Sequence, residues 1–243
     1  MHRRPSGNGL SGRFIVLDGP DGCGKSTQVN LLAEHLRSQG NQVVCTADPG
    51  GTRIGNQIRR LLKYDADGHM DVRTEVMLFM ASRAQLASEV IGPALQAGKT
   101  VLCDRYISAT CAYQGSSGYD TEQIIELGRL AVGTVWPDVT IILDLPVEEG
   151  LLRAGRKPGQ KTLVNHKHAG QSHLFENAAV DRFDSRPLDY HRKVRKEFLR
   201  LPDYYPGFVR IVDASQRDIQ GVHTSVVEVI SGWAKAHSPS SDS

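Results

Sequence analysis

The chain alternates between short apolar runs and longer segments in which apolar residues recur at helical spacing. The apolar runs have the length and the β-branched content of buried strands. They cover residues 14–18, 42–46, 100–104, 139–144 and 208–213. The segments with helical spacing cover residues 26–39, 54–63, 73–96, 121–132, 147–156, 186–200 and 217–234.

Buried strands that alternate with helices predict an α/β fold, with a five-stranded parallel sheet flanked by helices. Ligands of such sheets bind at the carboxyl ends of the strands. Four of the five predicted strands end in an acid at that edge: Asp18, Asp104, Asp144 and Asp213. The candidate chemistry is therefore expected at one edge of the sheet.

Residues 158–180 break the alternation, because they are polar and weakly periodic. A loop of this length inside a compact domain is usually functional or disordered. We therefore predict a single domain over residues 13–236, with a lid at about 153–186 that contains this polar insertion. Residues 1–12 are predicted to be a disordered arm, and residues 237–243 a disordered tail.

Composition excludes several classes of protein. The net charge of the 243 residues is only +2, so no strong field favours nucleic acid or a membrane surface. No apolar run approaches the roughly 20 residues of a membrane span. The four cysteines form no CxxC pair, and the first residues lack the apolar segment of a secretory signal. We expect a cytoplasmic protein that binds neither nucleic acid nor membranes.

The segment GPDGCGKST, residues 19–27, follows the first predicted strand and opens the first predicted helix. It fits the phosphate-binding pattern GxxxxGK[ST], in which backbone N–H groups and a helix N-terminus face an anion. Lys25 would then contact the outer phosphates of a bound triphosphate, and the Ser26 hydroxyl would bind Mg²⁺. The alternative is a glycine-rich structural turn, which the strand, the spacing and the helix together disfavour.

Two further patterns concern the acceptor of the phosphoryl group. Asp104 ends the third strand, where it could hold Mg²⁺, and Arg105 beside it could clamp an anion; a helix cap with a surface arginine is the alternative. Phe79 and Arg83 are four residues apart on one predicted helix. A ring and a guanidinium on one face suit a flat base, although such a pair, taken alone, is more often core packing with a surface arginine.

Six segments occur in an order that resembles the thymidylate kinase family: GPDGCGKSTQ, DPGGTRIGNQIRRLL, LFMASRAQ, DRYISATCAYQG, LDLPVEEGLLRAGRK and DRFD. The resemblance runs from about residue 14 to residue 233. It implies a P-loop nucleoside monophosphate kinase fold, Mg²⁺ as cofactor, ATP and dTMP as substrates, and a homodimer. It also implies transfer of the γ-phosphoryl group of ATP to dTMP, which yields ADP and dTDP for dTTP synthesis.

The resemblance also assigns residues. ATP would be bound by Gly19, Pro20, Asp21, Gly22, Cys23, Gly24, Lys25, Ser26, Thr27 and, beside the adenine, Ser215. The nucleotide acceptor would be bound by Asp21 at the sugar hydroxyl, Phe79 and Arg83 at the base, Arg105 at the phosphate, Tyr106 and Ser108 where deoxyribose is distinguished from ribose, and Tyr113 and Gln114 in the thymidine pocket. Ser26 and Asp104 would hold the metal.

Gly22 after the P-loop acid implies that the catalytic arginine comes from the lid, as in the bacterial pattern of the family. The candidates are Arg153, Arg156 and Arg182, and a solvated basic face is the alternative for each. We expect Lys25, Arg105 and one of these arginines to carry most of the catalysis, with Asp104 beside the metal.

Two departures from the family pattern stand out. Ala47 and Asp48 replace the usual Arg-Glu before Pro-Gly-Gly, and the insertion 158–180 lengthens the lid. His166, His168 and His173 within the insertion could bind a metal or belong to a polar loop. Two rival functions stay open: a kinase for dUMP or a broader pyrimidine set, and a nucleotide-binding regulator without catalysis.

Overall fold

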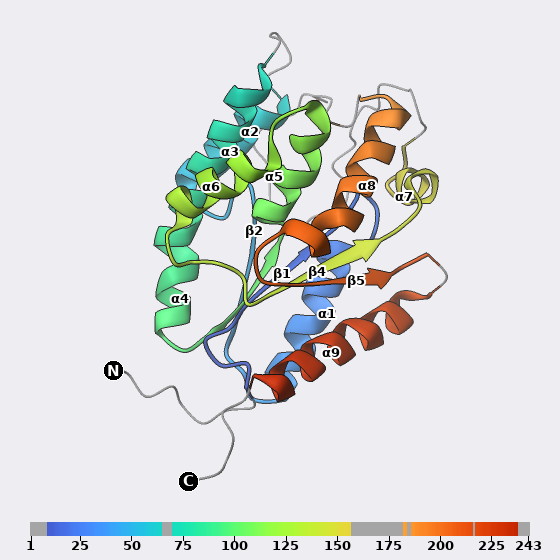
Figure 1. The fold of residues 1–243 in the computed structure, drawn as a ribbon. Helices are drawn as coiled ribbons and strands as arrows, with labels where there is room; N and C mark the ends of the chain where they lie inside the picture. The colour runs from blue at the N-terminus through green and yellow to red at the C-terminus, as the bar shows by residue number, and fades with distance from the viewer. Residues whose placement is uncertain (1–8, 65–69, 157–181, 184–185, 216, 238–243) are drawn as a thin grey trace.

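A computed structural model of the chain describes residues 9–64, 70–156, 182–183, 186–215 and 217–237. Its centre is a parallel sheet of five strands in the order β2-β3-β1-β4-β5, which confirms the predicted fold class (Figure 1). The strands are β1 (Phe14–Asp18), β2 (Val43–Ala47), β3 (Thr100–Asp104), β4 (Val139–Asp144) and β5 (Phe208–Asp213). Four of them begin and end at the predicted residues, and β2 is shifted by one.

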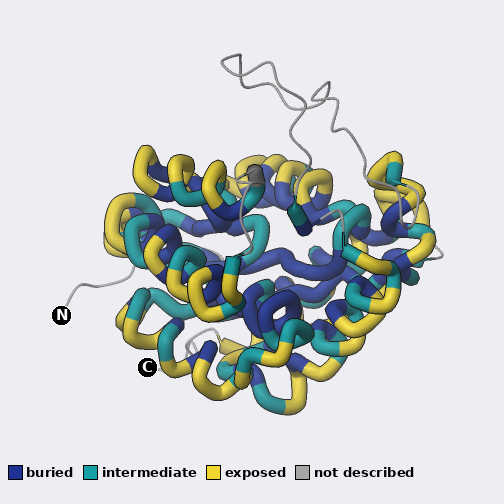
Figure 2. Tube along the Cα trace, turned by 90° about the horizontal axis from the view of Figure 1, so that it is seen from above, coloured by how far each residue is buried: buried dark blue, intermediate teal, exposed yellow. Residues whose placement is uncertain are grey.

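The two faces of the sheet follow from the alternation of side chains along each strand. In β1, Phe14 and Val16 join one apolar core, whereas Ile15 and Leu17 join the other. The helices α1 (Lys25–Ser38) and α9 (Ile219–Ala236) pack together on the second face. Figure 2 shows the buried strands enclosed between helices whose outer residues are exposed.

The first face carries the helices α2 (Arg53–Tyr64), α3 (Val72–Leu86), α4 (Gly92–Gln96), α5 (Ile107–Tyr113), α6 (Thr121–Val132) and α8 (Leu188–Tyr204). Of these, α2, α3 and α5 line the pocket described below. The short helix α7 (Val147–Arg153) follows β4 at the carboxyl edge of the sheet. A single turn of 3-10 helix, Gly115–Ser117, follows α5.

Helix α8 ends at Tyr204, four residues beyond the prediction, and the observed helices differ from the predicted ones in three further places. The predicted helix 73–96 contains a π-helical segment, Ala87–Ile91, which separates α3 from α4. Helix α7 ends at Arg153, three residues early, because the backbone turns at Gly155 with φ +70°. Helix α5 was not predicted, since seven residues are too few to establish a helical period.

The chain already contacts the domain a few residues before the predicted boundary at residue 13. Leu10 is buried in the core, Ser11 donates its hydroxyl to the carbonyl of Gly98, and Gly12 N–H donates to the same oxygen. The chain is thus packed against the domain from Leu10 onward. Residues 1–8 of the predicted arm, residues 238–243 of the predicted tail and the whole of the lid insertion 158–180, with His166, His168 and His173, lie outside the described residues.

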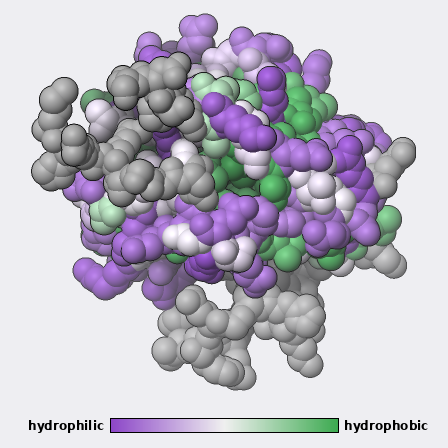
Figure 3. Space-filling model, turned by 90° about the horizontal axis from the view of Figure 1, so that it is seen from below, coloured by the Kyte–Doolittle hydropathy of each residue, from purple (hydrophilic) through white to green (hydrophobic). Residues whose placement is uncertain are grey.

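Within the described ranges, no helix combines the length and the hydropathy needed to cross a membrane. Seen from below, hydrophilic side chains surround a smaller hydrophobic area near the middle of the face (Figure 3).

Candidate active site

The loop between β1 and α1 has the backbone that an anion site requires. Gly24 precedes α1 with φ +94°, and no side chain caps the first turn of this helix. The first N–H groups of a helix lack partners inside the helix and carry its positive dipole end. N–H groups in this position can bind a phosphate group. Ser26 and Thr27 are exposed at this end, beside the loop formed by Gly19, Pro20, Asp21, Gly22, Cys23 and Gly24.

Two glycines of this loop are required by close backbone contacts. A Cβ on Gly19 would lie 2.3 Å from the carbonyl oxygen of Leu143, and one on Gly22 would lie 1.9 Å from that of Gly150. Both distances are far below van der Waals contact, and both glycines have positive φ. The loop is therefore pressed against β4 and against α7.

Lys25 lies inside the loop. Its Nζ donates to the carbonyl oxygens of Gly19 (3.2 Å) and Pro20 (2.9 Å) and lies 3.6 Å from Sγ of Cys23. The side chain is buried, so the ammonium group is held next to the backbone that would surround phosphates. Burial raises the pKa of the Cys23 thiol, which keeps this sulfur neutral.

Ser26 and Asp104 meet across the edge of the sheet. The Ser26 hydroxyl donates to Oδ2 of Asp104 at 2.6 Å, because β1 and β3 are neighbours. Hydroxyl and carboxylate oxygens are the ligands that Mg²⁺ prefers. The described residues contain no group of three or more metal-binding His, Cys, Asp or Glu side chains, so an ion here would take its remaining ligands from phosphate and water. The donor set fits Mg²⁺ in a nucleotide complex.

Arg105 is the centre of the site. It is the one described non-glycine residue with positive φ (+71°), which is a costly backbone conformation that clusters at functional sites. Its guanidinium donates to Oδ1 of Asp18 (3.0 Å), the carbonyl of Gly19 (2.9 Å), Oδ1 of Asp21 (2.6 Å) and the hydroxyl of Tyr113 (3.1 Å). The group thereby connects the phosphate loop to α5.

Asp18 was predicted only as a strand-end acid and was not assigned to the site. It is fully buried, and it accepts hydrogen bonds from Gly19 N–H (2.9 Å), the Ser108 hydroxyl (2.6 Å) and Arg105. Burial raises the pKa of Asp18, and Arg105 opposes that shift. The residue fixes the position of Arg105, and the strand-end pattern of acids was the signal that could have revealed it.

Asp21 faces two guanidinium groups. Arg105 donates to Oδ1, and Arg156 donates to Oδ2 at 3.3 Å. Burial alone would raise the pKa of Asp21, but the positive charges of Arg105, Lys25 and Arg156 outweigh it and hold that pKa well below its usual value. Asp21 is therefore ionised, and it lines the neighbouring pocket.

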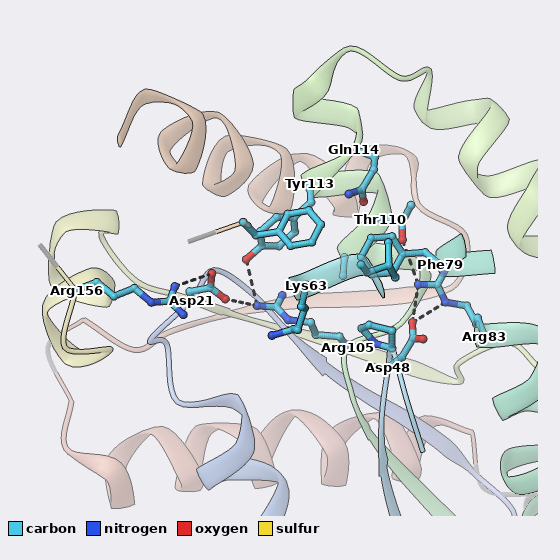
Figure 4. A pocket seen from close by; sticks show the side chains of 14 residues that line it. Asp21, Asp48, Lys63, Phe79, Arg83, Arg105, Thr110, Tyr113, Gln114 and Arg156 are labelled. Atoms are coloured by element: carbon cyan, nitrogen blue, oxygen red, sulfur yellow. Dashed lines mark hydrogen bonds and ion pairs between the residues drawn. The ribbon is translucent and has the colours of Figure 1, made fainter. Parts of the chain in front are cut away.

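A pocket extends from the P-loop acid to the first-face helices (Figure 4). Arg105 and Arg156 lie at the end near Asp21, Phe79 and Arg83 lie at the other end, and Tyr113 lies between them. Phe183 packs between Phe79 (ring centroids 6.1 Å apart) and Tyr113 (6.4 Å apart). The lining residues are Asp21, Asp48, Pro49, Leu62, Lys63, Phe79, Arg83, Arg105, Ala109, Thr110, Tyr113, Gln114, Arg156 and Phe183.

Arg83 lines this pocket but is fully buried and heavily bonded. Its Nε donates to Oδ2 of Asp48 at 2.7 Å, and Nη2 lies 2.5 Å from the same oxygen. Nη2 also donates to the Tyr106 carbonyl and the Thr110 hydroxyl, both at 3.1 Å. Asp48, the shorter acid in the departure from the family pattern, thus anchors the predicted base-binding arginine.

Tyr106 and Ser108 are not among the described residues that line the pocket. The resemblance had placed them in the acceptor site, where deoxyribose is distinguished from ribose. The Tyr106 ring packs edge-on against Phe14 (5.0 Å), and its hydroxyl donates to the Val135 carbonyl. Ser108 faces Asp18. Along α5, the helical period instead turns Ala109, Thr110 and Tyr113 toward the pocket.

Gln114 lies at the end of α5 with its amide in the pocket. Nε2 donates to Oε2 of Glu75 at 2.9 Å, and Oε1 is buried without a hydrogen-bond partner. Sequence reasoning missed Glu75, Thr110, Lys63 and Phe183. Each looks like an ordinary helix or loop residue until the fold brings it to the pocket.

The three lid arginines point to three different places. Arg153 pairs with Glu149 (2.6 Å) and lies 3.4 Å from the Ala214 carbonyl, near the turn that Ser215 forms with Asp213 after β5. Arg182 pairs with Glu75 at 2.9 Å. Arg156 pairs with Asp21 and, of the three, lines the pocket.

A phosphate loop on a 2-3-1-4-5 parallel sheet, an adjoining Ser–Asp oxygen pair and an aromatic pocket beside the loop define a P-loop nucleoside monophosphate kinase. The comparisons with known proteins identify the family. The profile of the thymidylate kinase family matches residues 17–226, and the chain belongs to that family.

Individual relatives agree with this assignment. Thymidylate kinase from Desulfovibrio desulfuricans is 42% identical over 84% of this chain and 88% of its own. That from Exiguobacterium sibiricum is 38% identical over 93% of this chain and 97% of its own. The crystal structure of thymidylate kinase from Ehrlichia chaffeensis is 29% identical, with a TM-score of 0.66 over 90% of this chain and 98% of that chain.

Proposed function

We propose that the protein transfers the γ-phosphoryl group of ATP to the 5′-phosphate of dTMP and yields ADP and dTDP. The observation that carries the proposal is the position of Arg105, which contacts the phosphate loop through Gly19 and the pocket through Tyr113. A guanidinium there can bind the acceptor phosphate next to the transferred group.

The donor is assigned to the loop between β1 and α1. Backbone N–H groups and Lys25 would hold the phosphates of ATP, and the turn at Ser215 would lie beside the adenine. Ser26 and Asp104 would hold Mg²⁺, which would neutralise phosphate charge when bound. Thr27 would add a hydroxyl to the same phosphates.

The acceptor is assigned to the pocket. Phe79 would stack on the base, and Arg83 and Gln114 would bind its polar edge. Asp21 would bind the sugar hydroxyl, because an anion between phosphates is stabilised by a hydrogen-bond donor. Tyr106 would act on the base site through its backbone carbonyl, which binds Arg83, and Ser108 would act on Arg105 through Asp18.

Catalysis would rest on position and charge. The acceptor is already an anionic phosphate, so no strong general base is required. Of the three lid arginines, we assign the transition-state cation to Arg156, since it already lies at Asp21. Arg153 and Arg182 would support the lid. The homodimer and the cytoplasmic location remain predictions.

The test is an assay of ADP release with Mg²⁺-ATP and dTMP, dUMP, dCMP, dGMP or UMP as acceptor. Strong turnover with dTMP and weak turnover with UMP supports the proposal. Preference for dUMP would favour the broader pyrimidine kinase. Tight ATP binding without turnover of any acceptor would favour a regulator that has lost catalysis.

A further inference from the structure

Two buried acceptor atoms in the pocket have no hydrogen-bond partner among the described residues. They are Oε1 of Gln114 and Oδ1 of Asp48. An unpaired buried acceptor costs free energy, and native proteins leave few of them. Two such atoms in one ligand pocket therefore point to a ligand that brings a hydrogen-bond donor.

The orientation of the Gln114 amide is fixed by Glu75. The amide presents an oxygen on one side and an NH₂ group on the other. Its Nε2 donates to Oε2 of Glu75 at 2.9 Å, and a carboxylate accepts hydrogen bonds but donates none. The reversed amide would place two oxygens face to face. Gln114 must therefore keep Oε1 on its other side, and Figure 4 shows the amide directed toward Phe79 and Thr110.

Glu75 is itself held in place. It is 1% exposed, and its second oxygen, Oε1, accepts from Arg182 (2.9 Å) and Arg186 (3.0 Å). Arg186 also donates to the Ser117 hydroxyl at 2.9 Å, just beyond the end of α5. Rotation of the carboxylate would break these charged hydrogen bonds, so Glu75 is a rigid reference for the amide.

We propose that Glu75 is a positioning residue that sets the base preference of the pocket. By holding Oε1 of Gln114 toward the ligand, it offers an acceptor to the N3–H group of thymine or uracil. Cytosine has an unprotonated N3, which would face this oxygen without a proton between them. The proposal rests on the proposed function, since it assumes that a pyrimidine nucleotide occupies the pocket.

Asp48 is the rival acceptor. Both of its oxygens accept whichever way the carboxylate turns, and Oδ2 already binds Arg83. Asp48 can therefore also accept a hydrogen bond from N3–H. Unlike an amide, its carboxylate presents an acceptor in either orientation, so no neighbour is needed to orient it. Gln114 does need one, and Glu75 supplies it.

The experiment measures kcat and KM for dTMP and dCMP in the wild type, Glu75→Gln, Gln114→Leu and the double variant. A glutamine at position 75 can donate or accept, so the Gln114 amide becomes free to turn over. We expect the ratio of kcat/KM for dTMP to that for dCMP to fall about tenfold, the value of roughly one hydrogen bond. The change should lie mainly in KM. In the double variant, the Glu75 substitution should add nothing to the effect of Gln114→Leu.

Arg186→Met is the matched control, because Arg182 still holds Oε1 of Glu75 in this variant and Oε2 stays with Gln114. Its dTMP to dCMP ratio should stay within about twofold of the wild type, whatever its melting temperature. Should Glu75→Gln fail to fold, Glu75→Asp draws the carboxylate away from Gln114 by one methylene, and the same fall in the ratio is expected.

An unchanged ratio in a folded Glu75 variant would overturn the inference. So would a ratio that collapses in Asp48→Asn and is unaffected by Gln114→Leu, because the acceptor would then be Asp48. A wild type that fails to phosphorylate dTMP would overturn the proposed function as well, so the two failures are distinguishable.

Discussion

Arg105 donates a hydrogen bond from Nη2 to Oδ1 of Asp21 at 2.6 Å, between a residue of the phosphate loop and one that follows β3. The same guanidinium binds Asp18, the Gly19 carbonyl and Tyr113. Three carboxylate or carbonyl groups and a phenol thus hold one cation at the junction of the phosphate loop and the pocket.

Replacement of Arg105 should abolish most of the turnover. Arg105→Ala is expected to lower kcat/KM for dTMP by about 10²-fold or more, because a preorganised cation at the transferred charge is lost. Arg105→Lys should recover little, since a lysine cannot reproduce the fork of donors. Steady-state kinetics measure both. Arg129→Ala, on the exposed surface of α6, is the control and should have wild-type kinetics.

Asp104→Asn should weaken the binding of Mg²⁺ at the site. We expect the Mg²⁺ concentration for half-maximal activity to rise by about tenfold, because one anionic oxygen next to Ser26 is removed. A titration of Mg²⁺ at saturating substrates measures the shift. An Asp104→Asn enzyme with the wild-type Mg²⁺ curve would show that the Ser26–Asp104 pair does not hold the ion.

Gly22→Ala should disturb the phosphate loop beyond the cost of its backbone conformation. Its Cβ would lie 1.9 Å from the Gly150 carbonyl, so the loop must move away from α7, and KM for ATP should rise. Gly40→Ala is a matched control, because Gly40 also has positive φ (+85°) and meets nothing within 4 Å. Both variants should lose about 1 kcal/mol to the left-handed conformation, and only Gly22→Ala should change ATP kinetics.

The ion pairs of Asp21 should make stability depend on pH. Its pKa in the folded chain lies below the unfolded value, so its contribution to stability is complete above the unfolded pKa and is lost as the pH falls toward the folded pKa. Between pH 5 and pH 3, the wild type should therefore lose about 1 kcal/mol more than Asp21→Asn. Urea unfolding at the two pH values tests this. Equal losses in both proteins would contradict the assigned pairing.

Much of the fold was predictable, because strands and long helices carry their period in the sequence. The phosphate loop was predictable for the same reason, since its backbone geometry demands glycine at fixed spacing. Helix α5 was not, because seven residues give too little pattern. The burial of the Tyr106 side chain away from the pocket was also not predicted. Tyr106 follows Arg105, and the positive φ of Arg105 cannot be inferred from its residue type.

The site was predictable where one residue type performs one task, as at Lys25 and Arg105. It was not predictable where a contact joins distant positions. Asp48 meets Arg83 across 35 residues, and Glu75 meets Gln114 across 39. Such pairs form only when the sheet and the helices have assembled. In the sequence alone, the partners cannot be distinguished from other polar residues.

The central claim is that one cleft joins an ATP site to a dTMP site. The most direct measurement is ³¹P NMR of Mg²⁺-ATP and dTMP with the wild type and with Arg105→Ala. We predict the β-phosphate signal of dTDP to grow with the wild type as the γ-phosphate signal of ATP declines, and to be nearly absent with the variant. Decline of the ATP signal with inorganic phosphate as the product, or equal dTDP formation by Arg105→Ala, would contradict the account.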